Sequence, residues 1–230
     1  MKIRFRLPLS IMAVCLLSVF SISCTQESYE SGTGKYSLMR AEFVDAHTNG
    51  EGKIFSVMTD EGDSLLLTAP AERTWAAKAD TTFRCLLYYN KVGNNAELIS
   101  ISSVPAPPIR ETADLKEGMK SDPVKFVSSW TSTNRRYLNL ELVLMTGSTD
   151  EDTALQKIGC VCDSVSTAAD GSRHVWLSLY HDQGGVPEYY SASVYMSIMT
   201  SRLPIAVKEG DQVSIVIPTY SGKITRNFSF

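Results

Sequence analysis

The residues in this chain that are best suited to chemistry are three histidines and five cysteines among 230 residues. The sharpest pattern is the Cys-x-Cys pair of Cys160 and Cys162, which could form half of a metal site. A zinc site needs a second pair of ligands at matching spacing, and none accompanies this pair. In a β-strand the two thiols would share one face with Cα atoms about 6.6 Å apart, which is poor disulfide geometry. We expect both to fill a strand's inner face as small hydrophobic groups.

The histidines do not predict a site either. His174 and His181 are seven residues apart, so on one strand they would face opposite sides and could not share a metal. His47 lies in a different block of the chain. The acidic run 150–152 is consecutive, unlike the alternating ligands of an EF-hand loop, and is expected to be a solvated loop. We expect no catalytic residue, no cofactor and no metal, and hence no enzyme.

The serines do not predict a nucleophile site. The chain is rich in serine, but it has no Gly-x-Ser-x-Gly elbow and no glycine-rich phosphate loop. A hydrolase would therefore need a site scattered over loops, for example near His174 or His181. An extracytoplasmic hydrolase of this kind stays as an alternative.

The N-terminal segment predicts export and a lipid anchor. Three basic residues precede an apolar stretch, 9–22, that is too short to span a membrane and typical of a signal peptide. The stretch ends in Ser21-Ile22-Ser23-Cys24, which resembles the lipobox of bacterial lipoproteins, although Ser21 stands where Leu is usual. We expect residues 1–23 to be the signal peptide and Cys24 to be lipidated. Ordinary secretory cleavage, which would leave Cys24 as a free thiol, is the alternative.

Residues 24–34 contain Gln, Glu, Ser and Gly and no aliphatic side chain, so they are expected to form a flexible tether. Three cysteines then remain in the exported domains, namely Cys85, Cys160 and Cys162. Three thiols do not make a disulfide scaffold. One bridge, from Cys85 to Cys160 or to Cys162, is left open.

The sequence predicts β-strands along almost the whole chain after the tether, grouped into two domains. In residues 35–104, three strands, a crossing segment with a short helix near Trp75 and two further strands predict an OB-type β-barrel. Residues 105–123 open with Pro105, Pro107 and Pro108 and are expected to be a Pro-rich linker. In residues 124–230, about seven strands with alternating apolar residues predict an immunoglobulin-like β-sandwich. The predicted fold class is all-β.

Charge argues against nucleic acid as a partner. The first 23 residues hold three basic residues and no acid, so the rest carries 19 basic against 25 acidic residues. Residues 35–104 alone carry seven basic and nine acidic residues, whereas a nucleic-acid reader needs a basic face. Trp75, Tyr88 and Tyr89 could line a ligand groove of the barrel, but half-buried core aromatics are the stronger expectation.

The order of several short motifs resembles the NigD-like lipoproteins. These motifs are Asp122-Pro123-Val124, Trp130, Tyr137-Leu138-Asn139-Leu140, His181-Asp182 and the Ser-rich strand 191–197, after the lipobox-like start, the barrel block and the Pro-rich join. The resemblance implies an exported protein of Gram-negative bacteria, with an OB domain, a β-sandwich and no known catalytic residues. The family is named from a bacteriocin gene cluster.

Anchor, tether and resemblance together predict an outer-membrane lipoprotein on the periplasmic or cell-surface side. We expect a non-catalytic binding or accessory module with a protein or glycan partner. A bacteriocin-immunity or envelope-protection role is the second alternative beside the hydrolase.

Overall fold

The computed structural model describes residues 34, 36–148 and 155–230. The predicted signal peptide, Cys24, nearly all of the tether and the acidic run 150–152 lie outside the described residues. The chain divides into two compact units, 1–38 and 39–230, and the second holds both β domains. Within the described part, no helix is long and apolar enough to cross a membrane.

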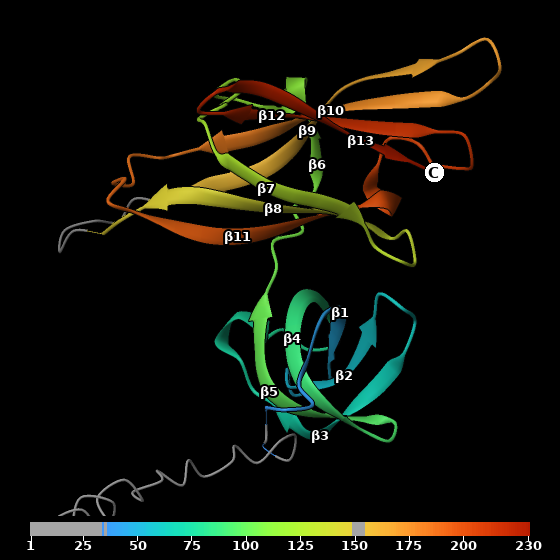
Figure 1. Cartoon of the computed structure of the whole chain (residues 1–230), viewed down its shortest axis with the longest axis vertical. Coiled ribbons are helices and arrows are strands. Elements are labelled where there is room, and N and C mark those ends of the chain that lie inside the picture. The colour runs from blue at the N-terminus through green and yellow to red at the C-terminus, as the bar shows by residue number, and fades with distance from the viewer. Residues whose placement is uncertain (1–33, 35, 149–154) are drawn as a thin grey trace, which may run out of the picture. The chain divides into compact units, whose positions relative to one another are not determined.

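The N-terminal domain is a closed five-stranded barrel, as predicted (Figure 1). Its order is β1-β2-β3-β5-β4, with β4 pairing back onto β1 and β3 running parallel to β5. This order is that of an OB-type barrel, and closure leaves no strand edge to protect. Its elements are β1 Arg40–Thr48, β2 Ile54–Thr59, β3 Ser64–Ala71, the 3₁₀ turn η1 Thr74–Ala76, β4 Thr82–Val92 and β5 Asn95–Ser103.

The period of two in these strands determines the barrel core. In β4, Cys85, Leu87 and Tyr89 are fully buried in the core. Arg84 directly precedes Cys85 and therefore points out of the barrel, so β4 delivers one large charged group to the barrel's outer surface. The β1–β2 turn needs its glycine, because Gly52 has φ +73° and a Cβ there would lie 2.4 Å from the Ala77 carbonyl oxygen.

Residues 105–123, which were expected to be only a linker, form part of the sandwich. After the prolines, β6 Ile109–Glu111 pairs in parallel with a strand of the sandwich, and η2 Thr112–Asp114 follows. Leu115 then packs on Val161 and Tyr180, on the outer face of the sheet. The residues from Ile109 have backbone N–H groups that prolines lack, so the chain can join a ladder as soon as the proline run ends.

The C-terminal domain is a β-sandwich, as predicted. One sheet has the order β13-β12-β10-β9-β6 and the other β11-β8-β7 (Figure 1). Its remaining elements are β7 Lys125–Thr131, β8 Tyr137–Thr146, β9 Lys157–Thr167, β10 Arg173–Asp182, β11 Tyr190–Met199, the 3₁₀ turn η3 Thr200–Arg202, β12 Gln212–Thr219 and β13 Gly222–Ser229. Alternate residues of both sheets meet in one core, among them Leu140, Leu177 and Ile215.

Candidate functional site

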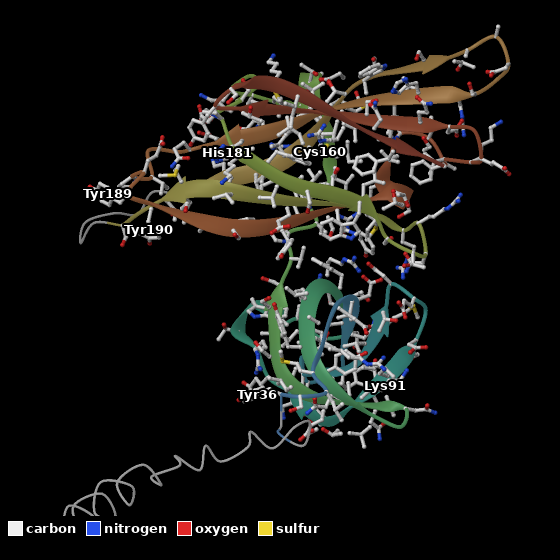
Figure 2. All side chains as sticks on the ribbon, in the orientation of Figure 1. Tyr36, Lys91, Cys160, His181, Tyr189 and Tyr190 are labelled. Carbon is white, nitrogen blue, oxygen red and sulfur yellow. The ribbon has the colours of Figure 1, made fainter. Side chains whose placement is uncertain are left out.

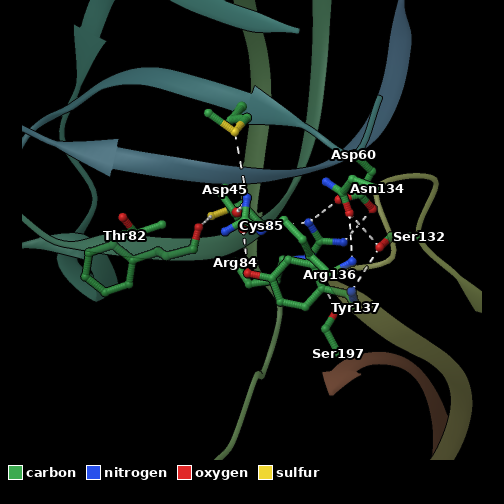
Figure 3. A network of polar contacts seen from close by, with 12 residues as sticks. Asp45, Asp60, Thr82, Arg84, Cys85, Ser132, Asn134, Arg136, Tyr137 and Ser197 are labelled. Carbon is green, nitrogen blue, oxygen red and sulfur yellow. Dashed lines mark hydrogen bonds and ion pairs between the residues drawn. The ribbon is translucent and has the colours of Figure 1, made fainter. Parts of the chain in front are cut away.

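Arg84 is the centre of a polar network at the junction of barrel and sandwich (Figure 3). Its Nη1 and Nη2 donate to the two carboxylate oxygens of Asp60, each at 2.7 Å. The guanidinium also lies 3.9 Å from the ring centroid of Tyr137, a sandwich residue. The Arg84 side chain is only 2% exposed. A charge so far from water is tolerated because it is paired in this bidentate geometry.

Asp45 of β1 is the second buried charge of the network. Its side chain is 3% exposed and pairs at 2.7 Å with Nη1 of Arg136, while Arg84 Nη1 lies 3.8 Å away. The Tyr137 hydroxyl donates to Asp45 Oδ1 at 2.7 Å. Burial, followed by this hydrogen bond to Asp45, raises the pKa of Tyr137 well above its ordinary value, so the phenol stays protonated as the donor. One barrel carboxylate thus binds two neighbouring residues of the sandwich.

The sandwich contributes two further polar side chains. Ser197 of β11 donates to Asn139 Oδ1 of β8 at 2.7 Å, and Arg84 Nε reaches the Ser197 hydroxyl at 3.4 Å. Beside them, the ring of Phe43 lies edge-on to Trp130 and Tyr195, with centroids 5.5 and 5.2 Å apart. Charge pairing and aromatic packing are therefore both found where the two domains meet.

A pocket of about 400 Å³ opens beside this network, and we call it the junction pocket. Its polar lining includes three guanidinium groups and an imidazole, from Arg84, Arg136, Arg202 and His47. No acidic residue of the described chain lines it. The pocket is therefore basic, although the protein as a whole is acidic.

A second candidate surface lies at one end of the sandwich, where three tyrosines are exposed to solvent. Tyr189 is 68% exposed, Tyr190 57% and Tyr220 56%, and we call these three residues the tyrosine cluster. Figure 2 shows Tyr189 and Tyr190 together at that end. Tyr220 lies in the same region, close to Glu188. Partial burial of the phenol, and then the neighbouring Glu188 carboxylate, raise the pKa of Tyr220.

The backbone under the tyrosine cluster is tightly held. The Tyr189 N–H donates to the Thr146 carbonyl at 3.0 Å. Gly184 has φ +61°, and a Cβ there would lie 2.5 Å from the Leu155 carbonyl oxygen. The Gln183 side-chain amide donates to the carbonyls of Met145 and Val186 at 3.0 and 2.8 Å. The tyrosines are thus presented by a fixed turn.

The structure separates the histidines, as the spacing predicts. His181 is fully buried among the inward-facing residues of β10, and its Nδ1 lies 3.1 Å from the Asp122 carbonyl (Figure 2). His174 is on the opposite face, stacked on Trp176 with centroids 4.2 Å apart. Its Nε2 lies 2.7 Å from the Ser214 hydroxyl, but Ser214 is fully buried and cannot reach a substrate as a nucleophile. Neither histidine therefore assembles the hydrolase site considered above.

The three cysteines of the described residues lie in or beside the two domain cores. Cys85 lies in the barrel core and Cys160 in the sandwich core, with Cys162 packed at the edge of the latter. All three are free thiols, so the bridge left open above is absent. Burial raises the pKa of Cys85 to about 12, and it raises the pKa values of Cys160 and Cys162 as well. The buried thiols of Cys85 and Cys160 are therefore structural and unreactive in the folded protein.

The aromatics named for a barrel groove lie mostly inward. Tyr89 is fully buried, and Trp75 packs on the barrel core edge-on to Phe83. Across residues 34, 36–148 and 155–230, no three histidine, cysteine or acidic side chains lie close enough to hold a metal ion. Sequence reasoning missed the Arg84 network, whose one signal was an arginine at an outward position inside the apolar run 83–89.

Known proteins share this architecture. A crystal structure of a NigD-like immunity protein from Bacteroides caccae is similar with 26% identity and a TM-score of 0.63, over 83% of this chain and 96% of that one. A putative toxin-related protein from Parabacteroides distasonis has the same fold at 16% identity and a TM-score of 0.62, over 84% and 93% of the two chains.

A third structure, a protein of unknown function from Bacteroides vulgatus, shares the fold at 15% identity and a TM-score of 0.59, over 84% and 90% of the chains. No curated protein matches. The family model for the NigD-like C-terminal β-sandwich domain matches residues 106–230. This match covers more than half of the sequence, and the chain belongs to the NigD-like family.

Proposed function

We propose that the protein is a non-catalytic binding module of the cell envelope that recognises a protein partner in an immunity role. The observation that carries this is the exposed tyrosine cluster, presented by a fixed turn on a member of the NigD-like family. Exposed tyrosines on a rigid backbone are typical of protein-recognition surfaces, because they bury large area at low entropic cost. The similarity to a NigD-like immunity protein supports the immunity role.

The charges around the tyrosine cluster indicate the kind of partner. Asp122, Asp182 and Glu188 lie at this end, and none of them forms an ion pair with another described residue. Asp122 and Asp182 accept backbone hydrogen bonds from Gln183 and Gly184 at 2.7 and 3.0 Å, which hold the carboxylates in place. Lys157 lies opposite Asp182 on the neighbouring strand, and Lys223 lies opposite Pro218, so this end presents both signs of charge. The proposed partner can therefore pair with groups of either sign.

The second part of the proposal concerns location. The sequence before the barrel supports a lipid anchor at Cys24 on the outer membrane, facing the periplasm or the cell surface. Stable anchoring takes more than one acyl chain, which a lipidated N-terminal cysteine would supply. Radiolabelled palmitate should be incorporated by the wild-type chain and not by Cys24→Ala. Equal labelling of the two would overturn the anchor.

Site-specific crosslinking tests the partner. A photoreactive amino acid is placed at Tyr189 or at Tyr190 and, as a matched control, at Leu66, which is 55% exposed on the barrel. In intact producing cells we expect one recurrent protein adduct from the tyrosine positions and none from position 66. Adducts to glycan alone, no adduct, or the same adduct from position 66 would each overturn the proposed surface.

The immunity role has its own test. A strain that lacks the protein should lose survival in co-culture with competing strains, and the wild-type chain should restore it. The double variant Tyr189→Ser/Tyr190→Ser should be exported normally and fail to restore survival. Unchanged survival of the deletion strain would overturn the immunity role.

A further inference from the structure

We propose that the junction pocket binds a small soluble oxyanion of the phosphate class. The pocket measures about 400 Å³ and brings together guanidinium groups from three separate segments. Arg84 comes from β4, Arg136 from the residue before β8, and Arg202 from η3. A guanidinium group can hold the paired oxygens of phosphate with parallel hydrogen bonds. Arg136, whose side chain is 47% exposed, and the exposed Arg202 can do so. The Arg84 donors are already bound to Asp60, Asn139 and Ser197, so Arg84 contributes charge alone.

The pairing of these arginines leaves positive charge in excess. Two carboxylates, Asp45 and Asp60, contact Arg84, and Asp45 also contacts Arg136. Arg202 donates through Nη1 to the Ala106 carbonyl at 2.9 Å and pairs with no acidic side chain of the described chain. Three guanidinium groups thus face two carboxylates, and the unopposed charge is on Arg202.

The remaining lining strengthens the attraction for an anion. Phe83, Val104 and Met199 contribute apolar surface, which lowers the local polarisability of the surroundings and raises the strength of each charge interaction. His47 Nδ1 lies 2.9 Å from the Thr82 hydroxyl, and both residues line the pocket. They add further hydrogen-bonding groups beside the guanidinium groups.

An anion in this pocket would contact both domains. His47, Thr82 and Arg84 belong to the barrel, whereas Arg136 and Arg202 belong to the sandwich. A ligand that binds only the folded, joined form stabilises that form in proportion to its occupancy. We therefore expect the bound anion to raise the midpoint of thermal unfolding.

The test uses the full chain in a neutral detergent at low ionic strength, titrated calorimetrically with pyrophosphate and with inorganic phosphate. Arg202→Gln removes the unopposed charge from an exposed side chain, so its midpoint without ligand should match that of the wild type. The matched control is Arg73→Gln, because Arg73 also donates to a backbone carbonyl, that of Glu72, and lies outside the pocket.

We expect saturable pyrophosphate binding to the wild type and to Arg73→Gln, and at least tenfold weaker binding to Arg202→Gln. Pyrophosphate should raise the midpoint of thermal unfolding of the wild type and of Arg73→Gln, and not that of Arg202→Gln. Should Arg202→Gln fail to fold, His47→Gln serves instead, with at least threefold weaker binding expected. No saturable binding to the wild type, or the same affinity for the wild type and the pocket variant, would overturn the site. The tyrosine crosslinks test the proposed function independently, since those residues lie outside the pocket.

Discussion

The Tyr137 hydroxyl of the sandwich donates a 2.7 Å hydrogen bond to a carboxylate oxygen of Asp45 in the barrel, and both side chains are buried. Because Tyr137 is the first residue of β8, the bond connects the start of a sandwich strand to the middle of a barrel strand. The buried carboxylate of the barrel residue Asp45 is thus stabilised in part by a side chain of the sandwich.

The first test is Tyr137→Phe, which removes the hydroxyl and keeps the ring. We expect a loss of about 1–3 kcal/mol in the free energy of unfolding, because Asp45 loses one partner in a buried site. Urea denaturation followed by fluorescence and by circular dichroism measures the loss. Tyr190→Phe, on an exposed ring, should stay within about 0.5 kcal/mol of the wild type. Equal effects of the two variants would contradict the buried role of the bond.

Arg84→Leu should be more severe, because it leaves two carboxylates without their shared cation. Breaking a buried ion pair by removing one partner costs about 3–5 kcal/mol. A double-mutant cycle with Asp60→Leu measures the coupling, and the double variant should lose less than the sum of the two single losses. Strict additivity would show that the bidentate contact carries no coupling energy.

Stability should also depend on pH through Asp211. Its hydrogen bond from Arg173 lowers the pKa of the carboxyl from an ordinary 3.8 to about 2. Since the folded pKa is the lower one, the stabilisation is complete above about pH 4–5 and is lost as the pH falls toward 2. Asp211→Asn should flatten the unfolding midpoint in that window, whereas Glu209→Gln, two residues away and exposed, should not. Parallel profiles for wild type and Asp211→Asn would contradict the assignment.

Thiol labelling reports on the two cores separately. Raised pKa values and burial keep Cys85 and Cys160 as protonated, shielded thiols at pH 8. We expect a thiol reagent to leave both unmodified in the native protein and to modify both in denaturant. Cys162 is only partly buried and serves as the internal reference for slow native labelling. Rapid native labelling of Cys85 would show that the barrel opens.

Much of the fold was predictable from local sequence. The alternation of Val175, Leu177 and Leu179 with other residues predicts both the strand β10 and its inward face, and the structure confirms it. The order of strands around a crossing segment likewise predicts the barrel. These features depend on the period of two in a strand, which a window of a few strand residues already displays.

The junction was not predictable from the sequence, for a physical reason. Arg84 meets Ser197 across 113 positions and Asn139 across 55, and such contacts depend on how two finished domains meet. The strand β6 was missed because three residues after a proline run carry no periodicity of their own. Their pairing comes from the open edge of β9.

The short connector between the domains has a mechanical consequence. The Val104 N–H donates to the Arg84 carbonyl in the barrel, and the Pro105 carbonyl accepts from the Ser197 N–H in the sandwich. Four residues after Pro105, at Ile109, the chain enters the parallel pairing of β6 with β9. A pulling force applied along the chain at this point would load these backbone bonds together as shear. Because these bonds tie the connector to both domains, we expect tension on one domain to be transmitted to the other through residues 104–111.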